Sequence, residues 1–150
     1  MFPSQPPKES PAIMNTQSNG SDVVKGFFAA FGKGDVEGVV ASFHPHAEIT
    51  AVRQGGRADG GLYGTYSGTE GVNDFVKALG ATFDTRAFAV DHVVGEGNVV
   101  FASGSFTHEL KSTRKPFRSD WALKCIIEEG KIREYHFYED SAAYVEASRP

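Results

Sequence analysis

The chain has 150 residues, a formal net charge of −4 and an apolar fraction of 40%, values that are typical of one folded domain. The negative charge and the lack of a basic cluster in the sequence argue against a nucleic-acid partner. No apolar run approaches the ~20 residues that cross a bilayer, so no membrane partner is expected. Because Cys125 is the only cysteine, no internal disulfide can form, and we expect a cytoplasmic protein.

The N-terminal segment, residues 1–20, differs in composition from the rest of the chain. It contains four of the seven prolines and almost no apolar pattern. It also lacks the basic start and apolar middle of a secretory signal. We therefore predict a disordered tail over residues 1–20 and a single folded domain over residues 21–150.

Three helical segments are predicted in the first half of the chain. The first ends at Gly32, the second begins after Asp35 as its N-cap, and the third begins after Thr69 and stops at Gly80. Each carries apolar residues at the spacing of one helix face. The three faces are Val23, Val24, Phe27, Phe28 and Phe31; Val36, Val39, Val40 and Phe43; and Val72, Phe75, Val76 and Leu79.

A strand pattern of period two follows the second helix and then dominates the second half of the chain. Glycines at residues 55–64 indicate a mobile flap, and turn residues at 95–98 and 128–130 predict hairpins. The strands are expected at about residues 47–53, 82–94, 99–110, 116–127 and 131–138. This order predicts an α+β fold, a cone-shaped α+β barrel in which a curved mixed or antiparallel sheet wraps around three N-terminal helices.

Four segments in this order resemble the SnoaL-like branch of the nuclear transport factor 2-like superfamily, over about residues 22–148. They are GFFAAFGKGDVEGVVASFHPHAEI, GTYSGTEGVNDFVKAL, SDWALKCIIEEGKI and REYHFYEDSAAYVEA. The resemblance implies a pocket inside the cone. The superfamily includes ketosteroid isomerases, polyketide cyclases, limonene epoxide hydrolases and noncatalytic binding proteins, so the fold alone does not give the function.

Two catalytic sets of the superfamily are missing. The ketosteroid isomerase tyrosine, base and protonated aspartate fall on Phe27, Ala51 and Ala122, which supply neither a donor nor a base. The limonene epoxide hydrolase positions fall on Gly104, Phe106 and Phe137. The chain is therefore not expected to be an enzyme of either kind. The polyketide cyclase aspartate is nearest to Asp140, which also suits the cap of a C-terminal helical turn.

These comparisons set the phase of the strands and so predict which side chains face the pocket. The expected inward residues are Ala102, Gly104, Phe106 and His108; Asp120, Ala122, Lys124 and Ile126; and Tyr135, Phe137 and Glu139. Asp120 and His108 are the candidate catalytic residues, because an acid in an aromatic pocket and a histidine can both transfer protons near neutral pH. An ion pair for Asp120 and a solvated position for His108 are the alternatives.

Further residues are expected to bind the ligand. Arg53 or Tyr66 would stabilise an oxyanion, although a surface ion pair for Arg53 and simple packing for Tyr66 are also compatible with the sequence. The predicted apolar lining consists of Phe27, Phe75, Leu79, Phe106, Tyr135 and Phe137.

The leading hypothesis is a protein that binds a small apolar, carbonyl-bearing metabolite. It would be a possible isomerase, cyclase or hydrolase that uses acid–base chemistry without a cofactor. The alternative is a noncatalytic ligand-binding or dimerising module. His44, His46 and Glu48 suggest a metal site, but no metal is expected, because two histidines beside a proline are typical of a surface turn.

A homodimer is also predicted, with the outer faces of two sheets packed together. The outer face is expected to carry Trp121, Leu123, Cys125, His136 and Tyr138.

Overall fold

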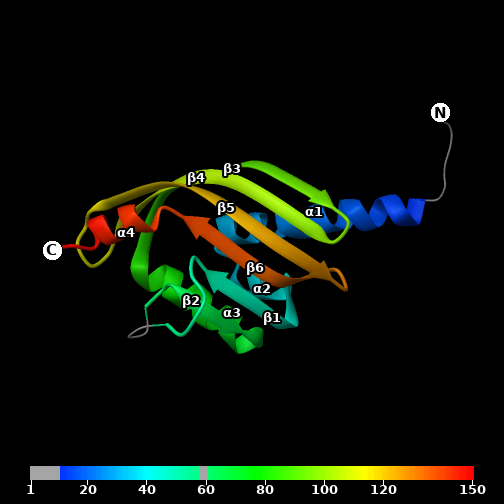
Figure 1. The fold of residues 1–150 in the computed structure, drawn as a ribbon, viewed down its shortest axis with the longest axis horizontal. Coiled ribbons are helices and arrows are strands. Elements are labelled where there is room, and N and C mark those ends of the chain that lie inside the picture. Colours follow the sequence, from blue (N-terminus) through cyan, green and yellow to red (C-terminus); the bar gives the residue numbers. More distant parts are fainter. Residues whose placement is uncertain (1–10, 58–60) are drawn as a thin grey trace.

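A computed structural model describes residues 11–57 and 61–150, with side chains from residue 20 onward (Figure 1). The four helices of these ranges begin and end as follows: α1 Pro11–Lys33, α2 Val36–Ala41, α3 Gly68–Thr82 and α4 Ser141–Ala147. The strands are β1 Phe43–Ala51, β2 Gly64–Ser67, β3 Phe83–Glu96, β4 Val99–Leu110, β5 Pro116–Glu128 and β6 Lys131–Glu139.

The first helix is longer than predicted. It begins at Pro11, where proline is tolerated because the first helical turn has no internal acceptor for its missing amide hydrogen. No further proline interrupts the chain before Pro45. The predicted tail therefore forms the first turns of α1 over residues 11–20, and its remainder, residues 1–10, lies outside the described residues.

The short second helix begins as predicted. Asp35 accepts a hydrogen bond from the backbone nitrogen of Gly38 at 3.0 Å, which satisfies one amide hydrogen of the first turn. Asp140 caps α4 in the same way, with the amide of Ala143 at 3.0 Å. The cap that the sequence offered as one explanation for Asp140 is therefore present.

The six strands form one mixed sheet in the order β2-β1-β6-β5-β4-β3. Only the β1–β6 pair is parallel, and the other pairs are antiparallel. The sheet curves but does not close, since β2 and β3 remain at its edges (Figure 1). The predicted α+β fold with a curved mixed sheet is confirmed.

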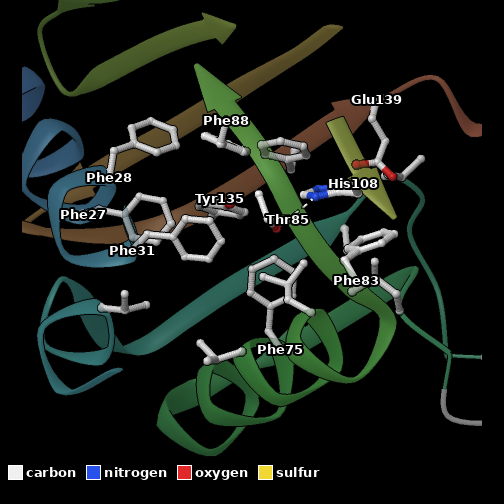
Figure 2. A pocket seen from close by; sticks show the side chains of 18 of the residues that line it. Phe27, Phe28, Phe31, Phe75, Phe83, Thr85, Phe88, His108, Tyr135 and Glu139 are labelled. Atoms are coloured by element: carbon white, nitrogen blue, oxygen red, sulfur yellow. Dashed lines mark hydrogen bonds between the residues drawn. The ribbon is translucent and has the colours of Figure 1, made fainter. Parts of the chain in front are cut away.

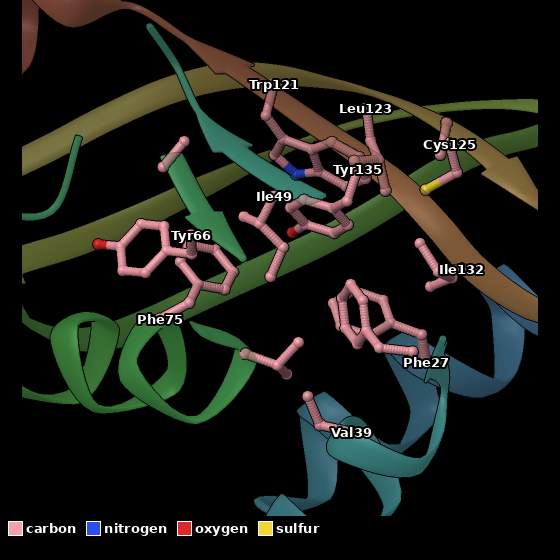
Figure 3. Close-up of a cluster of buried hydrophobic side chains, with 14 of the residues drawn as sticks. Phe27, Val39, Ile49, Tyr66, Phe75, Trp121, Leu123, Cys125, Ile132 and Tyr135 are labelled. Atoms are coloured by element: carbon pink, nitrogen blue, oxygen red, sulfur yellow. The ribbon is translucent and has the colours of Figure 1, made fainter. Parts of the chain in front are cut away.

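The apolar core lies between the concave face of the sheet and the helices. Helix α1 contacts β3 and β4, and α3 contacts β1 and β2. Figure 3 shows how side chains from both layers meet there. Fully buried members of this core include Val24, Ile49, Val72, Leu123, Cys125 and Ile132.

None of the helices within residues 11–57 and 61–150 combines the length and the apolar character required to cross a lipid bilayer.

Candidate functional site

The core is hollow on the concave side of the sheet (Figure 2). A cavity of about 230 Å³ opens there, which exceeds the roughly 150 Å³ of an engineered apolar cavity that holds benzene. Aromatic side chains supply much of its wall. They include Phe27, Phe28 and Phe31 of α1, Phe75 of α3, Phe83 and Phe88 of β3, and Tyr135 and Phe137 of β6.

One carboxyl group enters this aromatic cavity. Glu139 ends β6, and its Oε2 accepts a hydrogen bond from the Tyr63 hydroxyl at 2.6 Å. Strand alternation places Glu139 on the same face as Tyr135 and Phe137. Burial raises the pKa of Glu139 to about 7, although the hydrogen bond from Tyr63 acts in the opposite direction. The group therefore changes charge near neutral pH.

Tyr63 is itself held in place by its surroundings. Its ring packs on Tyr144 of α4, with ring centroids 4.9 Å apart. Burial, and then the charge of Glu139, raise the pKa of Tyr63. The tyrosine therefore remains a neutral hydrogen-bond donor to the carboxylate.

His108 is a further titratable side chain of the lining. It is buried between the rings of Phe83 and Phe106, at centroid distances of 4.2 Å and 4.1 Å. Its Nδ1 lies 3.0 Å from the Thr85 hydroxyl. Burial lowers the pKa of His108 to about 4, so the imidazole is neutral at pH 7 and offers one donor and one acceptor nitrogen.

The structure brings some of the predicted site residues together. His108 lies in the cavity lining, and so do Phe27, Phe75, Leu79, Tyr135 and Phe137. Their contact with a ligand stays a prediction. The inward phase predicted for β4 and β6 is confirmed, because Ala102, Phe106 and His108 are buried on β4 and Tyr135 on β6.

Three other predicted ligand contacts lie elsewhere. Arg53 is exposed beyond the end of β1 and is not part of the cavity lining. Tyr66 is buried, but its hydroxyl donates to the carbonyl of Leu62 at 2.5 Å and accepts from Arg57. Phe106 is not part of the cavity lining, and its ring packs against His108, which is. In the structure none of the three lines the cavity.

The phase predicted for β5 is wrong. Across the β5–β6 pair, Trp121 is opposite Glu139 and Leu123 is opposite Phe137, and directly paired residues share a face of the sheet. Trp121 and Leu123 therefore face the core, whereas Asp120 is exposed on the outer face. A shift of one residue exchanges the two faces of a strand, and the placement of the ketosteroid isomerase aspartate on Ala122 contained such a shift.

Two predictions change with this correction. Asp120 does not reach the cavity, so its assignment as a catalytic acid inside the pocket is wrong. Among the residues predicted for the outer face, Trp121, Leu123 and Cys125 belong to the core. His136 and Tyr138 do lie on the outer face, with the Tyr138 hydroxyl 3.0 Å from Nδ1 of His136. The homodimer stays a prediction.

The sequence pattern placed Glu139 on the inner face of the last strand, but neither Glu139 nor Tyr63 was predicted as a site residue. The inward phase of β6 was a usable signal for Glu139. The hydrogen bond from Tyr63 to Glu139 could not be predicted from the sequence, because the loop that carries Tyr63 meets the end of β6 only in the folded chain.

Three side chains outside the cavity are close enough to hold a metal ion: His44, Glu128 and Glu129. The Nε2 atom of His44 lies 2.9 Å from Glu129 and 3.7 Å from Glu128. The backbone amide of His46, however, donates to Nδ1 of His44 at 3.0 Å. In the neutral ring the proton then resides on Nε2 and is donated to Glu129, which leaves no lone pair for a metal there. This group joins β1 to the β5–β6 hairpin.

The curved sheet over helices, with an apolar cavity between them, defines a nuclear transport factor 2-like fold. Solved structures support this class. A nuclear transport factor 2-like protein from Burkholderia xenovorans superposes with a TM-score of 0.76 at 24% identity, covering 89% of this chain and 98% of that one. TerC, co-crystallised with polyporic acid, has a TM-score of 0.72 at 23% identity and covers 87% and 98%. These identities show the fold alone.

Within this class, the chain belongs to the SnoaL-like domain family, whose pattern matches residues 24–135. A curated relative is patulin biosynthesis cluster protein F of Penicillium expansum, which is 30% identical over 78 residues. The match covers 51% of this chain and 39% of that protein, so the chain spans well under half of the relative's length.

Proposed function

We propose that this protein binds a small carbonyl-bearing metabolite in the aromatic cavity and transfers a proton with Glu139. The observation that carries the proposal is the Glu139 carboxyl inside an apolar wall, hydrogen-bonded by Tyr63 at 2.6 Å. A general base works best when its pKa lies near the working pH. The pKa of Glu139, raised to about 7 by burial, meets that condition.

The proton transfer needs only groups that the cavity supplies. The Glu139 carboxylate removes a proton from the carbon beside the carbonyl, and the electron pair moves onto the carbonyl oxygen as an enolate. In a β,γ-unsaturated carbonyl compound, the protonated Glu139 then returns the proton to the γ carbon of the dienolate, which gives the conjugated isomer. Alternatively, the enolate carbon attacks a second carbonyl of the same molecule, which closes a ring, and the alkoxide that forms takes the proton back from Glu139.

Neutral His108 is suited to assist as a hydrogen-bond donor to the oxygen. A ring nitrogen that carries hydrogen stabilises a developing negative charge when it is fixed in a low-dielectric site. The Thr85 hydroxyl and the two flanking phenylalanine rings fix the imidazole. The fate of the enolate, isomerisation or ring closure, then depends on the substrate.

Two comparisons support a small organic ligand. TerC shares the fold and was crystallised with polyporic acid. The Penicillium expansum relative is named for a patulin biosynthesis cluster. Neither name defines the substrate of this chain, so the proposal rests on the cavity.

The test is exchange of carbon-bound hydrogen in D₂O, followed by proton NMR. The bicyclic ketone 2-tetralone serves as the probe, because it is larger than benzene and carries acidic hydrogens beside its carbonyl. We expect the wild type to accelerate exchange and Glu139→Gln to lose most of that acceleration. The matched control is Glu134→Gln, which alters an exposed glutamate on the outer face of β6. Equal rates in the wild type and Glu139→Gln would refute the role of Glu139.

A noncatalytic carrier is the second candidate. The many aromatic side chains in the wall favour it, since they bind a ring without chemistry. If 2-tetralone binds but exchanges no faster than in buffer, the carrier function is supported and proton transfer is rejected.

A further inference from the structure

The hydroxyl group of Tyr135 is an unused hydrogen-bonding group of the cavity wall. Tyr135 lies on the inner face of β6, is 4% exposed and lines the cavity. The rings of Phe27, Phe43 and Phe75 pack around it at centroid distances of 5.5 to 5.7 Å. Within the part of the chain that the structure describes, the tyrosine hydroxyls that form hydrogen bonds are those of Tyr63, Tyr66 and Tyr138, and that of Tyr135 is not among them.

The other tyrosines near the cavity differ in this respect. Tyr63 donates to Glu139, and Tyr66 donates to the carbonyl of Leu62. Buried tyrosine hydroxyls normally find a partner, because loss of water without a replacement is unfavourable. The free hydroxyl of Tyr135 is therefore available to a ligand acceptor.

A second unpaired donor lies in the same aromatic stack. The indole Nε1 of Trp121 is buried and has no hydrogen-bond partner among the described residues. Phe137 stacks on Trp121 at 5.3 Å and on Tyr135 at 6.3 Å. Figure 3 shows the indole nitrogen and the Tyr135 hydroxyl oxygen turned toward the same side of the core. Trp121 stands behind the cavity lining, so of these two donors only the Tyr135 hydroxyl belongs to a lining residue.

The charge of the lining restricts the ligand further. In residues 11–57 and 61–150, no lysine or arginine belongs to the cavity lining, and its one carboxyl is Glu139. A carboxylate or phosphate on the ligand would be buried without a cation, which is strongly unfavourable. A neutral acceptor oxygen, in contrast, suits a neutral donor.

We propose that Tyr135 determines substrate specificity by donating a hydrogen bond to a neutral acceptor oxygen of a one- or two-ring compound, whose ring lies against Phe137. This inference rests on the proposed function and names the substrate class of the same cavity. Tyr135 and Glu139 lie on the same face of β6, with Cα atoms about 13 Å apart along an extended strand. The acceptor oxygen at Tyr135 is a second oxygen of the substrate, distinct from the reacting carbonyl, and its position there leaves the carbonyl end of the molecule toward Glu139 and His108.

The experiment compares two probes of nearly equal shape, 1-indanone and indane, of which only the ketone has an acceptor oxygen. Because Trp121 is the only tryptophan, its indole N–H gives one identifiable signal in a proton–nitrogen NMR spectrum. That ring stacks on the cavity-lining Phe137, so its shift reports binding and yields Kd for each probe.

We expect the wild type to bind the ketone more tightly than the hydrocarbon, and Tyr135→Phe to lose about three- to tenfold of that preference, the effect of one neutral hydrogen bond. Tyr66→Phe is the matched control and should keep the preference, because that hydroxyl faces Leu62. A ketone preference that survives in Tyr135→Phe would overturn the inference. Spectral dispersion verifies that each variant is folded.

A third probe tests the charge requirement. Indane-1-carboxylate at pH 8 should bind at least about tenfold more weakly than 1-indanone, since the lining supplies no cation. Equal affinity would overturn the restriction to neutral ligands. Failure of all three probes to bind would reject the pocket function as well. If Tyr135→Phe loses the ketone preference while Glu139→Gln still exchanges 2-tetralone normally, the specificity site stands and the proton-transfer proposal fails.

Discussion

Glu139→Gln removes a titrating carboxyl from the cavity and keeps the size of the side chain and an acceptor oxygen for Tyr63. In the wild type, burial raises the pKa of Glu139 from 4.5 to about 7. The folded protein therefore retains a proton that the unfolded chain releases between these pH values. Linkage then gives a stabilising contribution that is complete below pH 4.5 and is lost as pH rises through 7. Its size is about 3 kcal/mol.

His108 contributes with the opposite sign. Burial lowers its pKa from 6.5 to about 4, so the unfolded chain binds a proton that the folded protein does not. The lowered pKa of His108 therefore contributes to the free energy of unfolding fully above pH 6.5, and this contribution is lost as pH falls through 4. This contribution is also about 3 kcal/mol. The two effects oppose each other over nearly the same window and largely cancel in the wild type.

Urea unfolding of the wild type, Glu139→Gln and His108→Gln between pH 4.5 and 7.5 separates the two effects. The stability of Glu139→Gln relative to the wild type should rise by about 3 kcal/mol from the acidic to the neutral end. For His108→Gln the same difference should fall by a similar amount. Glu134→Gln controls for the loss of one negative charge on the outer face. A difference between Glu139→Gln and the wild type that does not change with pH would refute the proposed environment of Glu139.

Three further predictions concern stability and assembly. Tyr66→Phe should destabilise the fold by about 1 kcal/mol in urea unfolding, because it removes the hydroxyl's hydrogen bond to Leu62; an unchanged midpoint would contradict this. Asp35→Ala should also lose about 1 kcal/mol, from the N-cap of α2, whereas Asp35→Asn should retain most of it in the same assay. Phe101 lies on the outer sheet face and is 51% exposed. If this face forms the predicted homodimer, Phe101→Asp should change the mass measured by light scattering from that of a dimer to that of a monomer. An unchanged mass would place the interface elsewhere.

Helices and strands could be predicted because their apolar residues recur with clear periods. The stripe through Phe27 and Phe31 and the alternation through Tyr135 and Phe137 each identify one buried face. The inner faces of β4 and β6 follow directly from that alternation. For β5 the same rule would have placed Trp121 inside. The family comparison displaced it by one residue, and a displacement of one residue inverts a strand.

The candidate site was harder to predict, because its chemistry depends on contacts between distant segments. Glu139 is ordinary in sequence, an acid beside the capping Asp140. Its pKa is raised by burial in the assembled fold, where Tyr63, from the loop before β2, reaches it with a hydrogen bond. Burial of this kind is a property of the assembled fold, and periodicity within one segment does not reveal it.

The distribution of polar groups explains how such a cavity can orient a ligand. Aromatic walls bind a ring in many orientations with similar energy, since dispersion contacts have little directionality. Hydrogen-bonding groups therefore decide the orientation. Tyr135 and Glu139 lie at separate positions of β6 with Phe137 between them. When Tyr135 holds a second, neutral oxygen of the substrate and the ring lies on Phe137, the reacting carbonyl is directed toward Glu139 and His108, which is the orientation that proton transfer requires.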